Sequence, residues 1–219
     1  MIDYYFQKLE KRKNISVDPA PVTYTLTEST VNFPEELGSI DFRVLGTNEA
    51  PEERALGLFW KNAEYLHAAA IMEDSDVYNT ASGKNMKTWA TGDVMELFFQ
   101  PDGVENYYEL HLTPEKATLE LNLPGEEKRL QVPFESMFYD SGFSYETGKF
   151  LLTSGFKGWW GHMKIPFSGI GLAGKSIKNS RFSVCRYNYS HNWEQPEKTS
   201  TSFYPEGGFH QARFWHKMI

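Results

Sequence analysis

The sequence predicts an all-β protein built as a two-sheet antiparallel β-sandwich with few short helical turns. Many short segments alternate apolar and polar residues and are separated by Gly, Pro and Asn turns, which is typical of sandwiches. No pattern of helical period extends beyond about three turns. We find no internal repeat and no low-complexity linker. At 219 residues the chain fits one domain, and a domain of this size buries about 70% of its unfolded surface.

The elements follow in order along the chain. Residues 1–21 are polar and form an N-terminal lead-in, with a short helix expected over residues 4–13. Residues 22–219 form the single domain. Strands are expected at residues 22–26, 40–45, 55–60, 93–100, 107–113, 117–122, 149–153, 159–165, 181–189 and 212–217. Turn signals at residues 101–103 and 114–116 separate three of them, and Pro166 ends another because proline cannot donate to a sheet.

Residues 64–72 are ambiguous by pattern alone. The run Ala68-Ala69-Ala70 is compatible with a helix, and periodicity does not decide the matter. The flanking loops are close, and the local pattern leaves both helix and strand open.

Composition excludes several classes of function. The net charge is −7, and the one basic cluster lies at residues 8–13, in a segment expected to be solvated; a nucleic-acid partner needs concentrated positive charge. No apolar run reaches the length of a membrane span. The sequence shows no signal peptide. The single cysteine, Cys185, cannot form an intrachain disulfide and is expected to be buried.

One part of the chain gathers residues suited to a sugar ligand. Trp89 follows a polar excursion, and Glu96 and His111 lie on the next two predicted strands. Alternation sends Glu96 to one side of its strand with Val94 and Phe98, and it sends His111 to one side with Tyr107, Glu109 and Thr113. If those sides coincide, Glu96 and His111 face one groove. A flat apolar plate surrounded by hydrogen-bonding groups is what a pyranose ring requires.

The order of motifs resembles the family 9-like carbohydrate-binding modules, β-sandwiches related to the DOMON superfamily. The resemblance spans residues 22–219 and rests on these segments: YLHAAAIMEDSDV, the spacing of Trp89, Asp93 and Glu96, YYELHLTP, WGHMKIPFSGIGL, RFSVCRYN and TSFYPEGGFHQARFWHKMI. It implies an immunoglobulin-like or DOMON-like sandwich with residues 64–72 as a strand. It also implies non-catalytic carbohydrate binding outside the cytoplasm, beside a separate glycan-degrading enzyme.

The resemblance further implies roles for particular residues. Trp89 and Phe209, with Tyr204 as the substitute for Phe209, would form an aromatic slot. Glu96, His111 and Arg186 would bond sugar hydroxyls. His111 and Phe209 depart from the family, which often has Arg or Gln and Trp at these places, so specificity is expected to differ. No cofactor is required, but structural calcium is common in the family, and Asp74, Asp76 and Asp93 are its weak candidates here because carboxylates suit hard cations.

Three other interpretations stay open. A β-sandwich with a decayed sugar site could serve as a scaffold or a protein-interaction domain. A haem-binding DOMON-type domain could use a Met and His pair, such as Met86 with His111; His162 and Met163 are adjacent on a strand and point to opposite faces. An enzyme is disfavoured because Asp93 and Glu96 also point to opposite faces, whereas a glycosidase needs two carboxyls flanking one bond.

Overall fold

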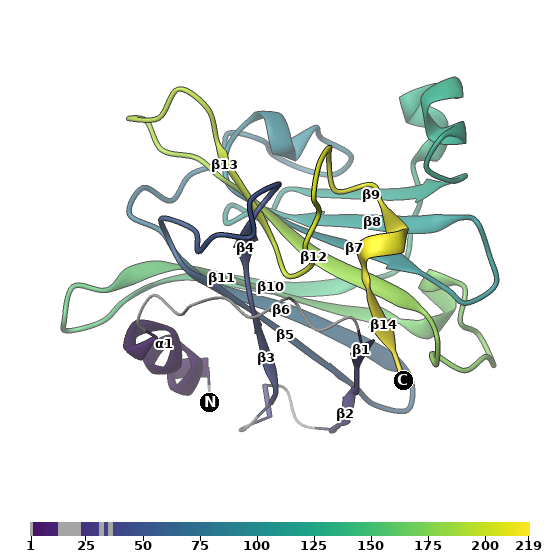
Figure 1. Cartoon of the computed structure of the whole chain (residues 1–219), viewed down its shortest axis with the longest axis horizontal. Coiled ribbons are helices and arrows are strands. Elements are labelled where there is room, and N and C mark those ends of the chain that lie inside the picture. The colour runs from purple at the N-terminus through teal and green to yellow at the C-terminus, as the bar shows by residue number, and fades with distance from the viewer. Residues whose placement is uncertain (1, 13–22, 31–32, 35–36) are drawn as a thin grey trace.

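Two β-sheets stack face to face in the computed structural model, which describes residues 2–12, 23–30, 33–34 and 37–219 (Figure 1). Within these residues the larger sheet has eight strands and the smaller sheet has six. The predicted all-β sandwich is confirmed, and residues 65–73 are a strand despite their three consecutive alanines.

The larger sheet contains the strands that form the floor of a cavity. Its main path has the order β1-β14-β12-β7-β8-β9, and β13 joins β12 to β4. The bounds of these strands are β1 Thr23–Tyr24, β4 Arg43–Val44, β7 Val94–Gln100, β8 Tyr107–Leu112, β9 Thr118–Leu123, β12 Arg181–Asn188, β13 Glu197–Ser200 and β14 His216–Met218.

The smaller sheet has the order β10-β11-β6-β5-β2, with β3 also paired to β5. The bounds of its strands are β2 Thr27–Glu28, β3 Ser39–Asp41, β5 Ala55–Lys61, β6 Tyr65–Glu73, β10 Ser144–Leu151 and β11 Lys157–Pro166. Among the described residues all strand pairs are antiparallel except β1 with β14 and β2 with β5, which are parallel.

The structure corrects several predicted bounds. The strand expected at residues 22–26 is two short strands, because the chain passes from β1 in the larger sheet to β2 in the smaller sheet. The strand expected at 212–217 begins only at His216, after a helical turn. β13 was not predicted, and β10 starts at Ser144, five residues before the predicted start of that strand. Arg12, expected to be solvated, pairs with Asp41 and donates to Ser39.

The helical content is small. The one α-helix of the described residues, α1, runs over Ile2–Lys11 and agrees with the predicted short helix, whose last expected residue, Lys13, lies outside the described residues. The 3₁₀ turns are η1 Thr88–Ala90, η2 Lys128–Gln131, η3 Phe134–Met137, η4 Phe167–Ile170 and η5 Ala212–Phe214. No described helix has the length and apolar character needed to cross a membrane.

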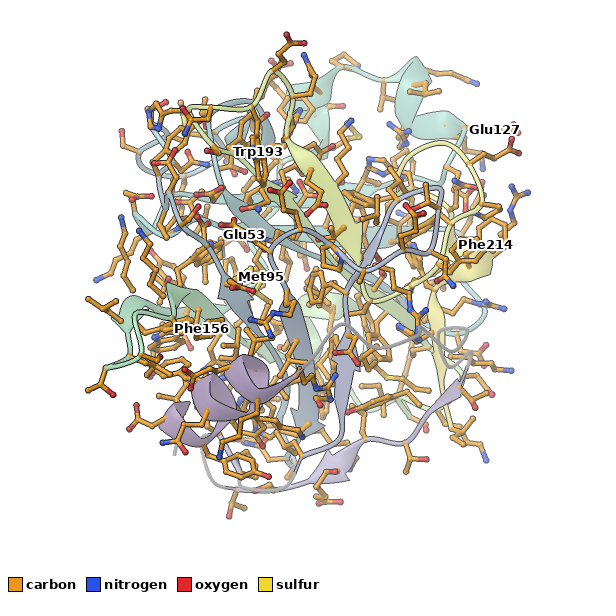
Figure 2. The ribbon with its side chains drawn as sticks, turned by 60° about the vertical axis from the view of Figure 1, so that its left-hand side comes forward. Glu53, Met95, Glu127, Phe156, Trp193 and Phe214 are labelled. Carbon is orange, nitrogen blue, oxygen red and sulfur yellow. The ribbon has the colours of Figure 1, made fainter. Side chains whose placement is uncertain are left out.

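Most strands of both sheets are buried on both faces, the mostly exposed edge strand β10 excepted, and this gives three apolar layers. The central layer lies between the sheets and contains Met95 and Leu97 of β7 (Met95 is labelled in Figure 2). A second layer covers the outer face of the larger sheet and contains Phe98, Tyr107 and Trp215. Because alternate residues of β7 face these two layers, the strand reads as a nearly continuous apolar run interrupted by Glu96.

The third layer is the contact between α1 and the smaller sheet. Tyr5, Phe6 and Leu9 share one face of the helix and are buried against Trp60 and neighbouring residues. The N-terminal lead-in therefore contributes a packed helix to the domain.

Two histidines are buried in this third layer. His67 Nδ1 and His162 Nε2 are 3.0 Å apart, and the Trp60 ring stacks on both imidazoles. Burial and nearby Lys164 lower the pKa of His67 to about 4, and burial, His67 and Lys164 lower that of His162 to about 3. Both side chains are therefore neutral in the folded protein at pH 5.

This pair predicts a loss of stability in acid. Unfolded histidines have a pKa of about 6.5, so below that pH the unfolded state binds protons that the folded state excludes. The unfolding free energy should fall as pH drops from about 6.5 to about 4, by ~1.4 kcal/mol per pH unit for each proton. The double variant His67→Gln/His162→Gln should show a slope shallower by at least ~1 kcal/mol per pH unit in denaturant titrations. Exposed His191→Gln is the control, and an unchanged slope in the double variant would contradict the assignment.

Candidate functional site

The floor of the site comes from β7 and β8. Glu96 pairs directly with His111 across these strands, and Glu109 lies two residues before His111 on the same face. His111 Nε2 is 2.7 Å from Glu109 Oε1 and 3.4 Å from Glu96 Oε1. The structure thus brings Glu96 and His111 together, as alternation predicted.

The walls of the site are aromatic. A cavity of about 300 Å³ opens above the floor. Its aromatic lining consists of Trp89, Phe134, Tyr187 and Phe209. Trp89 is half-buried and meets Phe134 edge to face at 5.8 Å between ring centres. Phe209 is only 4% exposed and packs on Tyr187, so it forms a fixed wall.

The loop that carries Trp89 is anchored on both sides. Thr88 Oγ1 lies 2.7 Å from His111 Nδ1, and Asn79 Nδ2 donates to the Thr88 carbonyl at 2.9 Å. The Tyr189 hydroxyl donates to the Trp89 carbonyl at 2.7 Å. These contacts hold the short turn η1 and set the indole over His111, with ring centres 5.6 Å apart.

Burial and mutual interaction shift the pKa values of the three ionisable groups on the floor. Burial raises the pKa of Glu96 to about 8, and His111 only partly offsets the effect. Burial also opposes ionisation of Glu109, but His210 and His111 more than compensate, so the Glu109 pKa is lowered. Burial disfavours the His111 imidazolium, yet Glu96 and Glu109 raise its pKa. The surroundings therefore favour the charged form of Glu109 over that of Glu96.

Arg186 lies away from this cavity. Its neighbour Cys185 pairs with Glu96, so alternation turns Arg186 to the opposite face of the larger sheet, toward the smaller sheet. The guanidinium is fully buried. It donates to the carbonyls of Glu53 and Glu73, at 3.1 and 2.8 Å, and to Asp74 Oδ2 at 3.3 Å. Its contacts join β12 to the ends of β5 and β6, and it does not line the cavity.

The three calcium candidates do not form one convergent set: the Asp74 and Asp93 carboxyl groups hydrogen-bond to each other, whereas Asp76 has separate partners. Asp74 is buried beside Arg186, while Asp76 accepts from the backbone and ring of His191. Asp93 accepts backbone N–H groups from Tyr78 and Tyr189, and burial raises its pKa to about 8. Within the described residues the set of three convergent ligand atoms is instead Glu96, Glu109 and His111.

The Met and His residues suggested for haem ligation either lie in different environments or already have hydrogen-bond partners. Met86 is 41% exposed, whereas His111 is fully buried and both of its ring nitrogens have partners. Met163 lies in the central layer, and His162 contacts His67 in the third layer.

Several lining residues were not predicted, including Glu109, Arg129, Phe134, Tyr187 and His210. Glu109 shares the face of His111 by simple alternation, so the sequence held a signal for it. Arg129, Phe134 and His210 lie outside strands, and no local pattern marks them.

The placement of Arg186 predicts a structural effect. Removing one partner of a buried ion pair leaves an uncompensated charge, so Arg186→Met should lower the unfolding free energy by ~3–5 kcal/mol. Exposed Arg213→Ala should change it by less than ~0.5 kcal/mol. Denaturant titrations of both variants provide the check; a fully stable Arg186→Met protein would show that the buried ion pair has little weight.

Comparison with solved structures shows the fold. No protein-family model and no curated protein matches the sequence. A candidate carbohydrate-binding protein from Bacteroides uniformis is 16% identical with a TM-score of 0.65, covering 90% of this chain and 97% of that one. A family 9 carbohydrate-binding module from Caldicellulosiruptor kristjanssonii matches in complexes with cellotriose (12% identity, TM-score 0.56, 91% and 90% coverage) and with glucose (11%, 0.55, 90% and 95%). The chain therefore has the fold of the family 9 carbohydrate-binding modules.

Proposed function

We propose that the protein binds carbohydrate without catalysis and that the cavity beside Trp89 holds the saccharide. The observation that carries this proposal is the composition of the cavity, in which a half-exposed indole stands beside two carboxyl groups on a sheet floor. The solved structures of the same fold support it, since two of them contain cellotriose or glucose.

The two kinds of lining match the two kinds of sugar surface. The axial C–H face of a pyranose is apolar and would pack on Trp89, a contact worth ~25 cal/mol per Å² of apolar area removed from water. The equatorial hydroxyls would meet Glu96, Glu109 and His210 at the cavity edge. Phe209 would bound the far side of the ring. His111 lies below the lining and acts on the ligand only through the two carboxyl groups that it contacts.

The size of the cavity suits the end of a saccharide. Its volume of about 300 Å³ is at the lower limit for small-molecule sites. A second hollow of about 410 Å³ shares Arg129, Gly208 and His210 with it. A chain end in the cavity would therefore extend its next residue over the glycine-containing loop at residues 206–211.

Binding is favoured over hydrolysis by the position of His111. In a glycosidase two carboxyl groups flank the bond to be cleaved. Here Glu96 and Glu109 flank the His111 imidazole instead, with one oxygen of each within 3.4 Å of Nε2. We therefore assign the floor to ligand recognition.

A separate glycan-degrading enzyme would be the natural partner of such a module. The competing role is a scaffold whose sugar site no longer binds carbohydrate.

Substitution of Trp89 tests the proposal. A glycan array with calcium present should show selective binding by the intact protein, and Trp89→Ala should weaken it at least about tenfold, since ~1.4 kcal/mol of lost contact corresponds to that factor. Trp193→Ala is the matched control. Trp193 is also half-buried but lies between β12 and β13, outside the cavity lining (Figure 2).

Three results would contradict the proposal. A cooperatively folded protein that binds no glycan would favour the scaffold role. Equal losses in Trp89→Ala and Trp193→Ala would mean that the ligand binds elsewhere. A visible absorption band in the purified protein would point to haem.

A further inference from the structure

We propose that Glu96, Glu109 and His111 form a binding site for one divalent transition-metal ion, zinc by preference, on the floor of the cavity. Each residue offers one ligand atom, and the three atoms all lie within 4.8 Å of one another. One imidazole nitrogen and two carboxylate oxygens make a donor set suited to zinc or manganese. This inference does not depend on the sugar-binding proposal.

The spacing of the ligand atoms is close to what a metal ion requires. Zinc holds nitrogen and oxygen ligands at about 2.0–2.2 Å in a tetrahedron, which places neighbouring ligand atoms about 3.3 Å apart. His111 Nε2 and Glu96 Oε1 are already 3.4 Å apart. Glu109 Oε1 is nearer to Nε2, at 2.7 Å, so the Glu109 side chain would need to move slightly outward.

A second, independent observation points to a missing ligand. Glu109 is 4% exposed, and its Oε2 atom is buried without a hydrogen-bond partner. His210 Nδ1 lies 3.8 Å from this oxygen, and that nitrogen is already 2.8 Å from the Tyr107 hydroxyl. A buried carboxylate oxygen without a partner costs free energy. A cation bound beside it would offset this cost.

The surroundings of His111 are those of a metal-ligating histidine. Such a histidine usually gives its other ring N–H to an oxygen atom, which fixes the tautomer and the ring orientation. Thr88 Oγ1, at 2.7 Å from His111 Nδ1, is placed to accept that hydrogen bond. Binding of the ion would release to solvent the Nε2 proton that Glu109 now accepts and any proton held by Glu96, and the Nε2 lone pair would then point to the ion between the two carboxylates.

The site would have an open coordination position and a path for entry. Glu96 and Glu109 line the cavity, whereas His111 lies behind them and is fully buried. Three protein ligands leave the fourth position facing the cavity, which is the arrangement of zinc sites that accept an exogenous ligand. Water or an oxygen atom of a bound ligand would complete the coordination.

Titration of the chelator-treated protein with zinc tests the inference in the absence of any glycan. Calorimetry on the full chain should give one equivalent of bound zinc. Glu109→Gln removes a ligand and should abolish this binding or weaken it more than about 100-fold, and Thr88→Val removes only the contact to Nδ1 and should weaken it about 10–100-fold. His191→Gln, which removes an exposed histidine paired with Asp76, should leave the affinity unchanged.

The outcomes separate this inference from the alternatives. The absence of stoichiometric zinc or manganese binding by the folded protein would overturn it. Zinc affinity that falls in His191→Gln but not in Glu109→Gln would assign the ion to the surface. Both Glu109→Gln and Thr88→Val should unfold cooperatively in denaturant. If Glu109→Gln does not fold, weaker binding of Co²⁺ by Thr88→Val, followed in the visible spectrum, would support the site, and unchanged binding would overturn it. Glycan binding with no metal binding would overturn this inference and leave the sugar-binding proposal intact.

Discussion

The two-residue period of β7, β8 and β12 is the constraint on which the rest of the structure depends. Both faces of these strands are buried, so each side chain must suit one of two different environments. Met95 and Leu97 fill the space between the sheets, while Glu96 and Phe98 face the outer layer. A slip of one residue would exchange these sets and place carboxylates in the central core. The register that stabilises the sandwich is therefore the one that assembles the cavity floor.

The same constraint explains the two opposite roles of charged groups in the larger sheet. Glu96 and Arg186 lie on adjacent strands but on opposite faces. Arg186 is neutralised by Asp74 and by backbone carbonyls, which links the two sheets. Glu109 is stabilised as an anion by His210, His111 and Arg129, whereas burial raises the pKa of Glu96 more than its neighbours lower it. Arg186 therefore lies between the sheets, away from the cavity, whereas Glu96 and Glu109 line the cavity, where a ligand can reach them.

The sequence was sufficient for the fold class and for most strands, because alternation and turn residues are local signals. Alternation also placed Glu96 beside His111, and applied more fully it would have included Glu109. It could not place Arg186, since the face of β12 depends on its register with β7, a contact between distant segments. The loop residues Phe134 and His210 were beyond prediction for a related reason: tertiary packing alone brings their loops over the sheet. Neither the strand at residues 197–200 nor the split between β1 and β2 has a strong local pattern.

The loop at residues 201–214 supplies Phe209 and His210 to the cavity and leads directly into β14, the partner of both β12 and β1. The ribosome makes these residues after all the strands of the floor. During synthesis the outer face of β7 and β8 therefore stays uncovered until residues 201–214 are made. β1 likewise stays unpaired until its parallel neighbour β14 is made. Contacts between such distant segments form slowly, and until they form the nascent chain exposes apolar, aggregation-prone surface.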